Sequence, residues 1–101
     1  DRALSLNSGS VKALNLKGLV TLKRGNPDEA EKYFEKAIES DSGYGEPYNN
    51  IGAIRWSQGR LDEAFKLFER AFILSPTSPD IAANFHAALA ELSGQKRRKS
   101  P

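Results

Sequence analysis

Few residues in this chain could do chemistry. Two adjacent acid pairs, Asp28-Glu29 and Asp62-Glu63, are candidates for shared proton transfer, and His86 is the single histidine. Paired carboxylates act as acid and base only inside a pocket, and a lone histidine needs a partner for proton transfer or metal binding. The chain has no cysteine, which excludes disulfides, thiol catalysis and cysteine-bound zinc. The sequence therefore indicates a protein that is not an enzyme and has no catalytic residue, metal site or cofactor.

The acid pairs lie 34 residues apart because they belong to an internal repeat. Residues 11–44 and 45–78, laid over each other, share ten identical positions, against roughly two expected from ordinary composition. A period of this length is typical of stacked units that each bury an apolar face against the next. The identical positions that bear on packing are Gly18 with Gly52, Ala30 with Ala64, and Phe34 with Phe68.

The apolar spacing predicts two helices in each unit. Residues 27–41 carry apolar side chains at i, i+3, i+4, i+7 and i+8, which lie on one helix face, and the second unit has the same pattern. Asn26 is expected to cap this helix, and Pro27 and the acids after it suit a helix start. The upstream helices, with the glycines expected to end them, are residues 11–24 with Gly25 and residues 46–58 with Gly59.

These units resemble tetratricopeptide repeats (TPRs). The matching residues are Leu14, Gly18, Gly25, Ala30, Phe34 and Ala37 in the first unit, and Tyr48, Gly52, Gly59, Ala64, Phe68, Ala71 and Pro76 in the second. Lys17 and Ser42 depart from the family pattern, which prefers Leu and Pro there. The resemblance implies an all-α fold, a right-handed superhelical stack of antiparallel helix pairs. The small residues would let the helices of a pair approach closely, with Phe34 and Phe68 filling the space beside them.

The remaining segments are interpreted as half-units. Residues 1–10 are expected to end a preceding second helix and its turn, residues 79–94 to form a capping helix that stops at Gly94, and residues 95–101 to be a flexible basic tail. His86 takes the place of Gly18 and Gly52, where a ring fits only if no second helix packs beside it. Since the chain begins at Asp1 and has no methionine, we expect it to be a piece of a longer protein.

The resemblance implies a concave groove lined by the first helices. The residues proposed to bind a partner are Lys12, Asn15, Leu19, Leu22, Asn49, Asn50, Ala53, Trp56 and Asn84. The last helix is expected to line the groove with Asp80, Ala83, Ala87, Ala90 and Glu91. Trp56 is expected to anchor an apolar ligand side chain, because Trp is enriched at binding hot spots; the alternative is that it packs against a neighbouring helix or a second copy.

Asn50 and Asn84 form a possible amide ladder, similar to the asparagine ladder in the TPR domain of O-linked N-acetylglucosamine transferases. Such amides can hydrogen-bond a peptide backbone, or instead tie adjacent helices together. The carboxylate clamp of chaperone-binding TPR domains is not expected, because only Asn50 matches it and Asp80 has the wrong charge for an anion.

The expected function is a scaffold that binds a peptide segment or a partner helix. One alternative is self-assembly through an apolar edge around Ala3, Leu4 and Leu6, and another is the non-catalytic arm of a larger enzyme such as a glycosyltransferase. Outside residues 96–99 the chain has eleven basic and thirteen acidic residues, which argues against specific nucleic-acid binding. No apolar run is long enough for a membrane span, and the location stays open, with the cytoplasm as the expectation.

Overall fold

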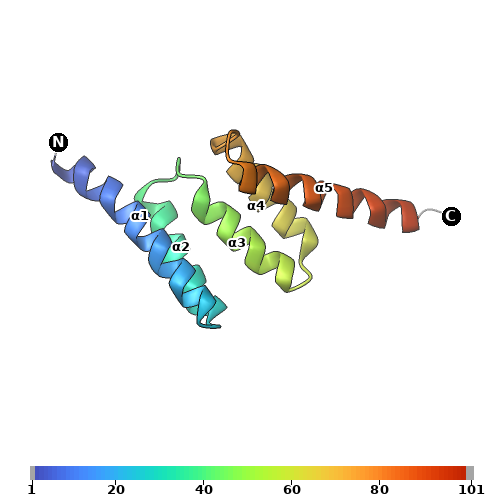
Figure 1. Ribbon diagram of the computed structural model, residues 1–101, viewed down its shortest axis with the longest axis horizontal. Helices are drawn as coiled ribbons and strands as arrows, with labels where there is room; N and C mark the ends of the chain where they lie inside the picture. Colours follow the sequence, from blue (N-terminus) through green and yellow to red (C-terminus); the bar gives the residue numbers. More distant parts are fainter. Residues whose placement is uncertain (1, 100–101) are drawn as a thin grey trace.

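The computed structural model describes the backbone of residues 2–99 and the side chains of residues 11–98. The described backbone forms five α-helices and no strand, in an elongated molecule of 59 × 28 × 19 Å. Figure 1 shows two antiparallel helix pairs followed by a single helix. The elements are α1 (Arg2–Lys23), α2 (Pro27–Ser40), α3 (Glu46–Ser57), α4 (Leu61–Leu74) and α5 (Pro79–Lys99). The predicted all-α architecture of stacked helix pairs is confirmed.

Two glycines end the first helix of each pair. Gly25 and Gly59 have φ angles of 88° and 77°, in the left-handed region that glycine adopts without strain. The next residue then folds back: the Asn26 N–H donates to the Thr21 carbonyl at 3.2 Å, and the Arg60 N–H donates to the Arg55 carbonyl at 2.9 Å. This is the Schellman pattern, which satisfies carbonyls at a helix end. The two predicted helix stops are confirmed.

The start of α2 differs from the prediction in one detail. Asn26 stands at the N-cap position, but its side chain makes no capping hydrogen bond. The backbone N–H of Asn26 takes part in the Schellman turn. The Asn26 carbonyl accepts the first hydrogen bond of α2, from the Ala30 N–H at 3.0 Å. Pro27 occupies the first turn as predicted, where its missing N–H costs nothing.

The two helices of each pair meet at a glycine. A side chain at Gly18 would collide with the Phe34 ring, and a Cβ built on Gly52 would lie 2.7 Å from the Phe68 ring. Phe34 is fully buried and Phe68 nearly so. The rings therefore fill the space that the glycines leave, as the sequence predicted.

Successive pairs stack through one repeated contact. Ala30 and Phe34 of α2 form a buried cluster with Ile51 and Ile54 of α3. One repeat later Ala64 and Phe68 of α4 pack in the same way with Ala88 of α5. The second helix of each pair thus covers one face of the next first helix.

An aromatic cluster joins α4 to α5. The Phe85 ring stacks on Phe72 with centroids 5.0 Å apart and on Phe65 at 5.5 Å. His86 is exposed, with its ring 5.9 Å from that of Phe72. This cluster fixes the last helix on the stack.

The predicted helix boundaries at the two ends are wrong. Residues 8–10 are helical, so α1 continues from Arg2 where a turn was expected; the Ser-Gly-Ser segment holds no proline, and one interior glycine costs only about 1 kcal/mol. At the other end α5 runs through Gly94 to Lys99, because a glycine stops a helix only in the left-handed conformation, and Gly94 has no positive φ. Residues 95–99 are therefore helical, and residues 100–101 lie outside the described part.

The predicted self-assembly edge of Ala3, Leu4 and Leu6 also falls outside what the structure describes. The backbone there is helical, but the described side chains begin at Val11.

Candidate functional site

Two amide pairs link the first helices. The Asn50 Nδ2 donates to the Asn15 Oδ1 at 2.8 Å, which joins α3 to α1. The Asn84 Nδ2 donates to the Asn49 Oδ1 at 2.9 Å, which joins α5 to α3. Each pair spans 35 residues, so one bond is repeated in successive units.

These pairs match the alternative interpretation of the asparagines, in which amides tie adjacent helices. Asn15, Asn49 and Asn50 are buried, and Asn84 is half-buried. A carboxamide has two N–H donors and an oxygen that accepts two bonds, so each pair uses only part of its capacity. Asn84, the most accessible of the four, keeps an Oδ1 that these bonds do not use. The amide pairs set the spacing of the first helices and leave one amide edge at the surface.

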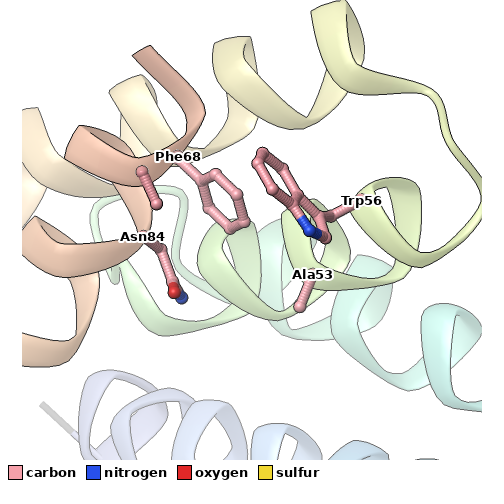
Figure 2. Close-up of a pocket in the computed structure, with 5 residues that line it drawn as sticks. Ala53, Trp56, Phe68 and Asn84 are labelled. Carbon is pink, nitrogen blue, oxygen red and sulfur yellow. The ribbon is translucent and has the colours of Figure 1, made fainter. Parts of the chain in front are cut away.

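A hollow of about 200 Å³ lies beside the second amide pair, where α3, α4 and α5 meet. Figure 2 shows the Phe68 ring between the side chains of Trp56 and Asn84, with Ala53 next to Trp56. The residues that line the hollow are Ala53 and Trp56 from α3, Phe68 from α4, and Asn84 and Ala87 from α5. The site is an apolar depression with a single amide at its rim.

Trp56 combines the two roles considered for it. Its ring is tilted by 47° against Phe68 with centroids 6.4 Å apart, so one side of the indole is packed on the core. The residue is nevertheless 36% exposed. An indole held by packing on one side and open on the other can contact an incoming apolar group at little entropic cost.

The predicted groove residues are only partly brought together. Ala53, Trp56 and Asn84 share the hollow. Leu19 and Lys12 are exposed on α1, but neither lines it. Leu22 is half-buried and packs against the buried cluster that contains Phe34, so it contributes to the core.

Phe68 lines the hollow, although the sequence predicted only a packing role for it. Gly52 lies four residues before Trp56, so both occupy one face of α3. Because Gly52 has no side chain, the Phe68 ring reaches across α3 to that face. The glycine at this spacing was the signal in the sequence that could have placed Phe68 in the site.

An ion pair next to the site fixes α3 on α2. The Arg55 guanidinium donates to both oxygens of Glu31, with Nη1–Oε1 at 2.7 Å and Nη2–Oε2 at 2.5 Å. Both side chains are less than one fifth exposed. Hydrogen bonding to Arg55 lowers the pKa of Glu31, and the same contact raises the pKa of Arg55. Because Arg55 precedes Trp56, this bidentate pair helps to orient the helix that carries the indole.

Within residues whose placement is described, no group of three or more His, Cys, Asp or Glu could hold a metal ion. No helix of that same part is long and apolar enough to cross a membrane.

Antiparallel helix pairs with a glycine–phenylalanine contact repeated after 34 residues define a helical-repeat protein. The family model of the tetratricopeptide repeat matches residues 1–45 and 15–79, so the chain belongs to the TPR family. Repeats of this family are generally protein–protein interaction modules without catalytic activity of their own. The chain has no match among curated proteins.

Proposed function

We propose that this TPR module binds a peptide segment or helix of a partner protein across its first helices, with one apolar ligand side chain seated on Trp56. The observation that carries the proposal is the hollow of about 200 Å³ beside a partly exposed indole. Pockets for drug-sized molecules begin at about 300 Å³, so the size favours a single side chain over a free small molecule.

Polar groups would orient the ligand around this anchor. The Asn84 Nδ2 is engaged by Asn49, which leaves the Asn84 Oδ1 at the rim to accept a backbone N–H of the ligand. Asn15, Asn49 and Asn50 support this amide indirectly, because they hold the three first helices at a fixed spacing. Lys12 and Leu19, exposed on α1, would extend the contact along the ligand.

The anchor is tested by removing its ring. Trp56→Ala should weaken binding at least tenfold, since losing a central aromatic anchor costs about 2 kcal/mol or more. Helix content by circular dichroism should change little, because Trp56 is partly exposed. Peptides selected from a random 12-residue library on the wild-type chain supply the ligand, and their affinities are measured by calorimetry.

Ile73→Ala provides the matched control, because Ile73 is 64% exposed on α4 and does not line the hollow. Selected peptides that bind Trp56→Ala as tightly as wild type would contradict the proposal. Self-assembly makes a different prediction: sedimentation equilibrium would show the mass rising above 11.1 kDa with concentration while Trp56 fluorescence shifts to the blue.

A further inference from the structure

A second apolar surface lies on α1, away from the Trp56 hollow. Leu16 is 61% exposed and Val20 is 44% exposed. A shallow depression of about 460 Å³ surrounds them, and its lining includes Ala13, Lys17, Arg24 and Tyr33. We call the surface formed by Ala13, Leu16, Lys17, Val20 and Arg24 the α1 face.

The internal repeat shows what covers this face elsewhere in the molecule. Val20 corresponds to Ile54 in α3 and to Ala88 in α5 after shifts of 34 and 68 residues. Ile54 is 2% exposed and Ala88 is fully buried. The α1 face is thus the uncovered copy of a surface that the structure buries twice.

Both buried copies are covered by the same kind of element. Ala30 and Phe34 of α2 cover α3, and Ala64 and Phe68 of α4 cover α5. The covering helix presents a small residue and, four positions later, a phenylalanine. A helix with this pattern therefore has the shape that the α1 face accepts.

The charge of the α1 face indicates which kind of helix would bind there. The charged residues of the α1 face are Lys17 and Arg24, and both are basic. The covering helix α2 has five acidic and two basic residues, a net charge of −3, and α4 has three and two, a net charge of −1. Lys17 occupies the repeat position of Ile51 in α3. At this point a helix bound to the α1 face would place a carboxylate beside Lys17, whereas the helix that covers α3 places an apolar group beside Ile51.

A second copy of this chain fits the face poorly. Its own α2 and α4 are already covered by α3 and α5. Its α1 face would bring Lys17 and Arg24 against the same two basic residues, and its α5 ends in a run of basic residues.

We propose that the α1 face docks an acidic amphipathic helix of a partner protein, laid on α1 as α2 lies on α3. Apolar contacts to Leu16 and Val20 supply the burial, and acids that flank the apolar stripe pair with Lys17 and Arg24. The Glu31–Arg55 pair shows that the molecule uses a carboxylate–cation bond at such a helix contact.

The test uses a peptide of known sequence. A synthetic peptide of residues 27–40, acetylated and amidated, carries the acidic stripe that the structure seats on α3. Titrated into the full-length 15N-labelled chain at low salt, it should shift the amide resonances of residues 13–24 saturably. The affinity should fall with added salt, because the attraction between exposed charges is screened. Trp56 fluorescence should stay unchanged, which separates this surface from the proposed groove.

Val20→Glu should lower the affinity for the peptide at least tenfold. Ile73→Glu, at another exposed apolar position, should bind the peptide with wild-type affinity. Both positions are exposed, so both variants should retain wild-type helix content. Three results would overturn the proposal: no saturable shift at millimolar peptide, shifts centred on α3 to α5, or equal binding to Val20→Glu. A concentration-dependent dimer that Val20→Glu abolishes would likewise overturn it, in favour of a second copy.

Discussion

At Gly18 and Gly52 the absence of a side chain decides how closely two helices can approach. The Phe68 ring lies 2.7 Å from where a Cβ would stand on Gly52, so any larger residue would push the ring or the helix away. Gly94 has a different environment, because the nearest atom to its would-be Cβ is the flexible Arg98 Nη1 at 3.4 Å. The same residue type is thus required at one site and replaceable at another.

Gly52→Ala should lower the free energy of unfolding by about 1–3 kcal/mol, the usual cost of overpacking a dense contact. Gly94→Ala should raise it by about 0.5–1 kcal/mol, because alanine is the better helix former in a helix interior. Urea unfolding monitored by circular dichroism measures both. Equal effects of the two substitutions would mean that the Phe68 ring has room to move aside.

The contact between α2 and α3 combines an apolar cluster with one bidentate ion pair. The pKa of Glu31 is lowered by its hydrogen bonds to Arg55. Its ordinary pKa is 4.5, so the folded state favours the ionised carboxylate more than the unfolded state does. The stability from this pair is fully present above pH 4.5 and is lost as the pH falls through the lower pKa of the folded state.

Glu31→Gln should therefore lower the free energy of unfolding by about 1 kcal/mol at pH 7, which is the usual contribution of a hydrogen bond. The charge on both groups increases this contribution, and their partial exposure to solvent decreases it. The difference from wild type should shrink as the pH drops below 4.5. Urea titrations at a series of pH values provide the measurement. Glu39→Gln, at an exposed acid on the same helix, controls for the change in net charge. A difference that persists at low pH would show that the amide is tolerated poorly for steric reasons.

For the whole molecule, α5 is the element whose loss should matter most. It buries Ile81 and Ala88 completely and places Phe85 against the Phe65 and Phe72 rings. Removing one large buried apolar side chain costs about 2–5 kcal/mol, while a domain is stable by only about 5–15 kcal/mol.

A chain that ends at Ser78 should accordingly unfold at a much lower temperature and with a broader transition than the full-length chain. Thermal circular dichroism measures both quantities. A chain that ends at Gly94 keeps these buried contacts and should lose much less. An unchanged transition in the shorter chain would show that the first two helix pairs are stable by themselves.

Much of this architecture could be predicted from one sequence because its causes are local. The helix pairs follow from apolar spacing, and the stops at Gly25 and Gly59 and the glycine–phenylalanine contacts follow from repetition. The continuation of α5 through Gly94 could not be predicted, because glycine permits a left-handed turn without requiring one. The sequence offered amides that tie adjacent helices as one interpretation of the asparagines, but it did not identify the pairs, since the pairing depends on how far α1, α3 and α5 lie from one another.

The order in which helices touch has a consequence for how the chain folds. In the described structure no helix contacts another that lies more than two elements away along the chain. Every contact therefore closes a short stretch of sequence, which keeps the entropy lost before each contact small. Proteins of such low contact order fold in microseconds to milliseconds, so the stack should assemble rapidly from any helix pair that forms first.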